Sequence, residues 1–168
     1  MEKAQKEAWL EEAMEKWAES ILRTCYAYLN DAALAEDALQ ETFLKAWKGY
    51  DRFRGEAQEK TWLMRIAINT CKDIRRSAYF RHVDRSTPIE ELPEGSVPFT
   101  MHDDTATRAV MQLRSPLKEA VLLCWYRQFS LNEASEVLGV SRATVYKRLE
   151  RARKILRKEL GEWYYEEE

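Results

Sequence analysis

Apolar residues recur with the period of an α-helix along most of the chain, and no segment alternates as a strand would. The spacing predicts helices over residues 3–29, 32–48 and 61–77, with Asp31 and Thr61 as the N-caps of the second and third. Since each apolar stripe must be buried against another helix, the three should form a bundle. The inward positions are Leu10, Met14, Trp17, Ile21, Tyr28, Ala35, Ala38, Leu39, Thr42, Phe43, Ala46, Trp47, Leu63, Ile66, Ala67, Thr70 and Ile74.

A second helical body is expected after a break in the pattern at residues 79–102. This stretch is acidic and holds three of the four prolines of the chain, which favours an extended, flexible linker. Helical periodicity returns near Asp103, and Ser115 followed by Pro116 predicts the start of a helix that ends near Arg127. We therefore predict an all-α protein with two small helical domains, residues 1–78 and 103–168, joined by that linker.

Residues 130–141 carry the strongest local signal in the chain. Ser130 and Glu133 have the spacing of a capping box at a helix start. Gly139 can supply the turn that ends this short helix, and Ser141 can cap the next one. Two helices joined by so short a turn cross steeply, which a small residue such as Ser135 permits. The pattern predicts a helix-turn-helix.

The last long helix predicted, from Ser141 onward, divides into an apolar side and a basic side. Val145, Leu149, Ala152 and Leu156 share the apolar side. The net charge of the chain is only −2, but its basic residues concentrate on this helix. A solvated basic helix is the simpler explanation; the coincidence of caps, glycine and basic face favours insertion into the major groove of DNA. The basic residues are Arg142, Lys147, Arg148, Arg151, Arg153, Lys154, Arg157 and Lys158.

Two further faces in the first bundle suggest binding partners. On the third helix, cations and one amide recur at helical spacing, and Arg52, Phe53 and Arg54 precede this helix. Cations together with an aromatic ring are suited to binding a single DNA strand. A solvated helix face explains the pattern about as well. On the second helix, the apolar Leu44 lies among polar outward residues, which favours a protein-contact surface. A single exposed leucine is also ordinary on a protein surface. The third-helix set is Arg65, Asn69, Lys72, Arg75 and Arg76, and the outward face of the second helix is Asp37, Gln40, Glu41, Leu44 and Lys48.

Composition argues against several other classes of protein. No stretch reaches the roughly 18 apolar residues of a membrane span, and no signal peptide begins the chain, so we expect a cytoplasmic protein without membrane insertion. Cys25, Cys71 and Cys124 are odd in number and far apart, which argues against disulfides. His82 and His102 fall in or near the linker, and neither a metal-ligand cluster nor a glycine-rich phosphate loop occurs. We expect no catalytic residues, no metal and no cofactor.

Three sequence blocks resemble the extracytoplasmic-function (ECF, group IV) sigma factors of the sigma-70 family. Residues 35–43, AEDALQETF, resemble the AED-x-x-Q-E-x-F signature of region two, and residues 61–69, TWLMRIAIN, resemble its TWL-x-RIA-x-N run. Residues 73–76, DIRR, resemble the D-x-x-R-R that follows in the family, with one residue instead of two between the acid and the arginines, and residues 130–156 resemble region four. The resemblance implies an RNA polymerase sigma factor that directs the core enzyme to promoters and opens them. A regulator that binds duplex DNA without polymerase is the alternative.

The resemblance also implies a role for each matched face. Asp37, Gln40, Glu41 and Leu44 would bind the clamp helices of the largest polymerase subunit, and region four would meet the flap of the second-largest subunit. An anti-sigma factor is a further partner that the family allows. The opened minus-ten element would contact Arg54, Lys60, Arg65, Asn69, Lys72, Arg75 and Arg76. The minus-thirty-five element would contact Arg142, Thr144, Tyr146, Lys147, Arg148, Glu150 and Arg151.

Overall fold

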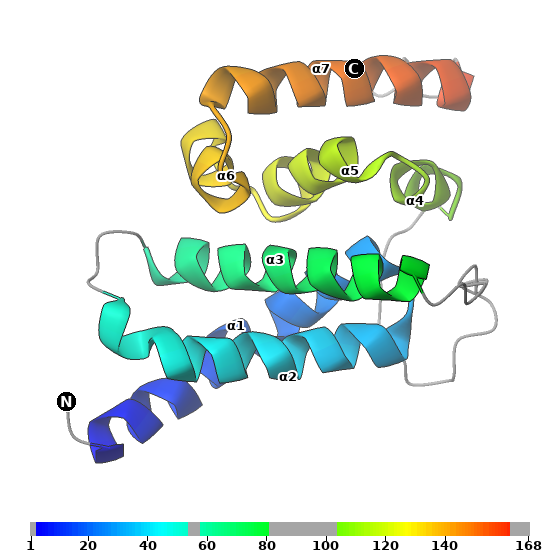
Figure 1. The fold of residues 1–168 in the computed structure, drawn as a ribbon. Coiled ribbons are helices and arrows are strands. Elements are labelled where there is room, and N and C mark those ends of the chain that lie inside the picture. Colours follow the sequence, from blue (N-terminus) through cyan, green and yellow to red (C-terminus); the bar gives the residue numbers. More distant parts are fainter. Residues whose placement is uncertain (1–2, 54–57, 81–103, 162–168) are drawn as a thin grey trace. The chain divides into compact units, whose positions relative to one another are not determined.

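The computed structural model describes residues 3–53, 58–80 and 104–161, and within these ranges all regular elements are helical. The helices fall into two bodies, α1 to α3 and α4 to α7 (Figure 1). The predicted all-α fold with two helical bodies is confirmed. Residues 81–103, which include nearly all of the predicted linker, lie outside the described residues. The precise domain boundaries therefore stay a prediction.

The first body consists of α1 (Lys3–Leu29), α2 (Ala32–Gly49), the 3-10 turn η1 (Tyr50–Arg52) and α3 (Glu59–Phe80). Asn30 ends α1 in a left-handed conformation, with φ 52°, and its N–H donates to the Tyr26 carbonyl at 2.7 Å. Asp31 then starts α2, because its carboxylate accepts a hydrogen bond of 2.9 Å from the Leu34 N–H. Each of the three helices packs against the other two, as Figure 1 shows.

The core of this bundle follows the predicted stripes with two corrections. Met14 is 44% exposed, and Ala13 occupies the buried position one turn before Trp17. Thr61 is not a cap, because α3 begins two residues earlier and the Trp62 N–H already donates to the Gln58 carbonyl. The Thr61 hydroxyl is buried and makes no hydrogen bond within the described ranges.

The second body consists of α4 (Asp104–Met111), α5 (Ser115–Val121), the π-helical turn η3 (Leu122–Tyr126), α6 (Leu131–Leu138) and α7 (Arg142–Leu160). Arg114, and not Ser115, holds the extended N-cap conformation, so Pro116 is the second helical residue. Proline is tolerated there because the first N–H groups of a helix have no helical partner. The three other helices, α4 to α6, all contact α7.

The helix-turn-helix is confirmed, and its local interactions are those that the sequence predicts. Ser130 and Glu133 form both hydrogen bonds of the capping box, at 3.0 and 3.1 Å. Gly139 adopts a left-handed conformation, with φ 67°, and its N–H donates to the Ser135 carbonyl. Ser141 then caps α7 by accepting the Thr144 N–H at 3.1 Å. These bonds fix the direction in which α7 leaves the turn.

Gly139 offers a test of this turn, with Gly49 as its matched control. An added Cβ at Gly139 meets no atom within 4 Å, so Gly139→Ala should cost only the left-handed backbone strain, about 1 kcal/mol. At Gly49, with φ −93°, a Cβ would lie an ordinary 3.7 Å from Trp62, so Gly49→Ala should cost nothing. Urea unfolding of the full chain measures both. Equal stability of the two variants would contradict the strain at the turn.

Candidate functional site

The outward side of α7 is the most strongly basic helix face of the second body. The apolar residues Val145, Leu149 and Ala152 are buried, which fixes the rotation of the helix about its axis. Lys147 and Arg151 lie on the opposite side and are exposed, as sequence periodicity predicts. A helix buried on one side and cationic on the other can present its side chains to a DNA groove.

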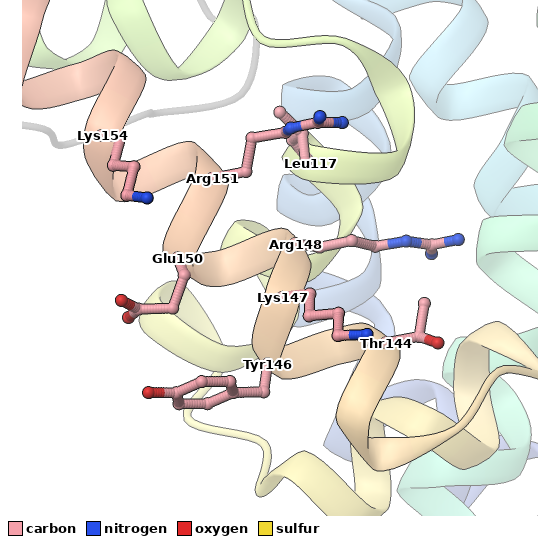
Figure 2. A pocket seen from close by; sticks show the side chains of 8 residues that line it. All are labelled: Leu117, Thr144, Tyr146, Lys147, Arg148, Glu150, Arg151 and Lys154. Carbon is pink, nitrogen blue, oxygen red and sulfur yellow. The ribbon is translucent and has the colours of Figure 1, made fainter.

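An open groove of about 510 Å³ runs along this side of α7. Figure 2 shows Tyr146 and Glu150 projecting from one side of the helix, while Arg148 and Arg151 extend from the other. Tyr146 is 56% exposed, so its ring is accessible to a partner in the groove. The groove combines cations for phosphates with a ring that can contact base edges. Its lining residues are Leu117, Thr144, Tyr146, Lys147, Arg148, Glu150, Arg151 and Lys154.

The groove therefore brings together six of the seven residues predicted to contact the minus-thirty-five element. Arg142, the seventh, is exposed in the first turn of α7 but does not line the groove. Lys154 also lines the groove. The sequence placed Lys154 on the basic side of this helix, at helical spacing from Lys147 and Arg151, although the resemblance did not include it in the minus-thirty-five set. Leu117 lines the groove as well and was not assigned to the site from the sequence. Leu117 belongs to α5, and no local pattern connects it to α7.

Glu150 is the one acid in this basic region, and it is paired within its own helix. Its carboxylate forms an ion pair with Arg153, and the Arg153 guanidinium also lies 5.6 Å from the centre of the Trp125 ring. Arg153 thus connects Glu150 of the groove to Trp125 of the π-helical turn η3. The pairing partly neutralises Glu150, so the groove stays cationic overall.

The second basic face lies on α3 in the first body. Arg65, Asn69, Arg75 and Arg76 are exposed, whereas Lys60 and Lys72 are half-buried. Arg54, the remaining member of the predicted minus-ten set, lies outside the described residues. The described members occupy successive turns of one helix, so their side chains can follow a strand of DNA along its axis.

The predicted polymerase-contact face on α2 is exposed along its whole length. Gln40 and Glu41 follow Asp37 by three and four residues, and Leu44 follows them by four and three, so all four lie on one side of the helix. Leu44 is 46% exposed even though the buried stripe of the same helix contains Ala38, Phe43 and Ala46. An exposed leucine bordered by acids suits a contact with a partly basic protein surface.

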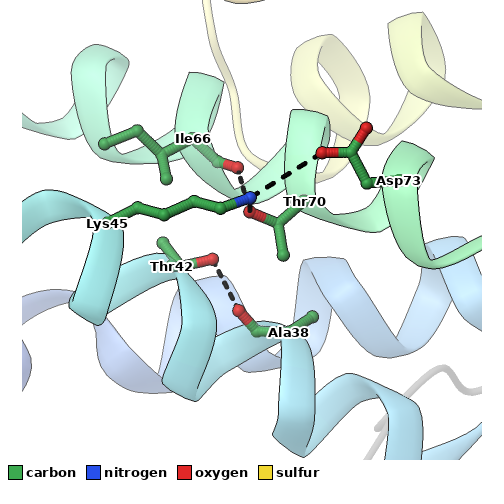
Figure 3. Close-up of polar contacts among 6 residues, drawn as sticks. All are labelled: Ala38, Thr42, Lys45, Ile66, Thr70 and Asp73. Carbon is green, nitrogen blue, oxygen red and sulfur yellow. Dashed lines mark hydrogen bonds and ion pairs between the residues drawn. The ribbon is translucent and has the colours of Figure 1, made fainter.

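A lysine that sequence reasoning missed connects α2 to α3, as Figure 3 shows. The Lys45 ammonium donates to the Thr70 hydroxyl at 3.1 Å and lies 3.7 Å from the Asp73 carboxylate. Thr70 in turn donates to the Ile66 carbonyl at 2.7 Å, within α3. Asp73 is 62% exposed, so this ion pair contributes little to stability. The contact joins α2, which bears Leu44, to α3, which bears Asn69.

Other kinds of site are not visible in the described part of the chain. Histidine, cysteine and acidic side chains there form no group of three or more that could hold a metal. Cys25, Cys71 and Cys124 are all free, and burial raises the pKa of the Cys124 thiol. In the same ranges, no helix has both the length and the apolar composition needed to cross a bilayer.

Comparison with known families matches both bodies. The family described as sigma-70 region 2 matches residues 13–81, and the family described as sigma-70, region 4 matches residues 104–156. Together these matches cover most of the chain. The first includes the exposed faces of α2 and α3, and the second includes the helix-turn-helix and most of α7.

Individual proteins agree with this result. The chain is 35% identical to the ECF RNA polymerase sigma factor SigL of Mycobacterium tuberculosis over 137 residues, which are 79% of this chain and 77% of SigL. It is 29% identical to the ECF sigma factor SigW of Bacillus subtilis over 158 residues, covering 86% and 84% of the two chains.

Solved structures share the fold. The sigma factor RpoE of Bartonella quintana, crystallised with the anti-sigma factor NepR, matches with a TM-score of 0.75 and 23% identity, over 89% of this chain and 95% of that one. CnrH, in complex with the cytosolic domain of CnrY, matches with a TM-score of 0.70 and 21% identity, over 94% and 93%. With the two family matches and the identity to SigL, these findings show that the chain belongs to the ECF sigma factors of the sigma-70 family, which direct RNA polymerase to specific promoters.

Proposed function

We propose that the two bodies divide promoter recognition between them. Region two, with α3, contacts the opened minus-ten element, and region four, with α7, contacts the minus-thirty-five element. The observation that carries this proposal is that each body exposes a cationic face on a helix whose other side is buried. On this assignment the domains are residues 1–78 and 103–168, with residues 79–102 as the tether.

The residues proposed to contact the minus-ten element are Arg54, Lys60, Arg65, Asn69, Lys72, Arg75 and Arg76. The cations bind phosphates and hold the strand in place, whereas the Asn69 amide is suited to read a base edge. The residues proposed for the minus-thirty-five element are Arg142, Thr144, Tyr146, Lys147, Arg148, Glu150 and Arg151. Lys147 and Arg151 supply charge, while Tyr146 offers an apolar surface to a base.

The acidic face of α2 is proposed to bind core polymerase. Asp37, Gln40, Glu41 and Leu44 would lie against the clamp helices of the largest subunit, and region four would meet the flap of the second-largest subunit. Exposed Leu44, one turn after Gln40 and Glu41, supports this role, because protein interfaces combine apolar contacts with polar ones. An anti-sigma factor is a further proposed partner, since RpoE of Bartonella quintana, which shares this fold, was crystallised with one.

Catalysis of RNA synthesis is assigned to the polymerase and not to this chain. Sigma factors are DNA-recognition subunits in general, and we propose that this chain follows them. We also propose a cytoplasmic location, because core polymerase and promoter DNA are found there.

Run-off transcription with purified core polymerase over a promoter library tests the proposed function. We expect specific transcripts that start only when this protein is added, from templates that share a minus-ten and a minus-thirty-five sequence. A helix-turn-helix regulator would bind duplex DNA but would not start RNA synthesis with core alone. The absence of any added start site on the library would contradict the proposal.

A further inference from the structure

The first turns of α1 hold an aromatic cluster against the start of α3. The Trp9 indole N–H donates to the Glu59 carboxylate at 2.9 Å, a partly buried bond between residues 50 positions apart. The Trp9 ring lies 4.3 Å from the ring of Tyr50 and 6.0 Å from that of Trp62, between centroids. Phe53 stacks on Trp62 at 4.5 Å. We call these residues, with Lys6, the α1 brace.

Lys6 adds a charged contact to the same cluster. Its ammonium lies 3.7 Å from the Asp51 carboxylate and 4.5 Å from the centre of the Trp47 ring. The side chain is only 16% exposed, so the cation is held between the acid and the ring, away from bulk water. Lys6 and Trp9 therefore tie α1 to both η1 and α3.

The brace lies at the first turn of α3. Thr61 is buried and does not cap the helix, and the first residue of α3, Glu59, is held instead by Trp9. The next residue along is Lys60, the first described member of the proposed minus-ten set. The orientation of that first turn thus depends on a residue of another helix.

Neither Lys6 nor Trp9 is part of the family match, which begins at residue 13. We propose that both are positioning residues for binding of the opened minus-ten strand. They hold the first turn of α3 in place, so that the cations and Asn69 of α3 are correctly oriented before the strand binds. Fixing these groups before binding lowers the entropy lost on binding. This inference rests on the proposed role of α3.

The test uses holoenzyme reconstituted from the full chain and core polymerase, with a fork-junction DNA that exposes the minus-ten sequence selected from the promoter library. Trp9→Phe keeps a ring against Tyr50 but removes the bond to Glu59, and it should weaken fork binding about fivefold. Affinity for core should stay within about twofold, since the brace lies on different helices from the α2 face. A matched control is Trp17→Phe, which removes a buried indole N–H that makes no hydrogen bond within the described ranges.

A double-mutant cycle shows whether Trp9 acts through Glu59. Glu59→Ala alone should weaken fork binding to a similar extent, and adding Trp9→Phe to it should cause little further loss. If Trp9→Phe and Glu59→Ala bind the fork as Trp17→Phe does, while Asn69→Ala weakens binding, the brace proposal is wrong and the role of α3 stands. If Asn69→Ala also has no effect, the assignment of α3 fails and the brace proposal falls with it.

Discussion

Arg151→Ala is expected to weaken promoter binding by the holoenzyme about tenfold, and Lys147→Ala by a similar factor. Each removes one cation from the groove of α7, and loss of a phosphate or base contact typically costs about 1–3 kcal/mol. Neither should unfold the chain, because both side chains are exposed opposite the buried stripe. If the lost contact is to a phosphate, about one counterion fewer is released on binding, so the logarithm of the affinity should fall less steeply with the logarithm of the salt concentration, by about one unit of slope.

Lys158→Ala is the matched control for this pair. Lys158 is exposed on the same basic stripe, seven residues after Arg151, but does not line the groove. Its loss removes the same charge without touching the proposed contacts, so promoter affinity should change far less. Filter binding or fluorescence anisotropy at several salt concentrations separates the variants. Equal losses for Lys158 and Arg151 would show that only the total charge of α7 matters, against the proposed recognition site.

The elements that the sequence predicted best are those whose ends depend on neighbouring residues. Asp31 and Ser141 cap their helices through bonds to residues three positions on. Gly139 ends α6 through its own backbone conformation. These interactions need no information from distant parts of the chain, which is why caps and turn residues could be read from the sequence. The exposed faces of α2 and α7 follow from the same periodicity once the buried stripes are known.

The features that sequence reasoning missed depend on contacts between distant residues. The start of α3 was misplaced because Trp9, 50 residues away, holds Glu59, and Thr61 is drawn into the core. Met14 was assigned to the core because a long helix offers two neighbouring apolar stripes, and only packing against α2 and α3 selects the one through Ala13. Lys45 gave no signal of its own, since a lysine at a half-exposed position usually faces solvent.

Asp37→Arg is expected to have the largest effect on polymerase binding, a loss of core affinity on the order of a hundredfold. The change reverses one charge at the edge of the α2 face, and like charges brought together at an interface cost several kcal/mol. Helix content should not change, because Asp37 is exposed and arginine is a good helix former. Leu44→Ala should lower affinity through lost apolar contact, with no change in the salt dependence.

Glu12→Arg is the control that distinguishes a specific face from overall charge. Glu12 is an exposed acid of α1, in the same body but outside the proposed contact set, and its reversal changes the net charge by the same amount. Pull-down and titration with labelled core polymerase should therefore show strong loss for Asp37→Arg and near-normal binding for Glu12→Arg. Undiminished core binding by Asp37→Arg would show that the α2 face is not part of the interface with polymerase. Because the proposed DNA faces lie on α3 and α7, promoter binding would then have to be explained with polymerase held by another surface of the chain.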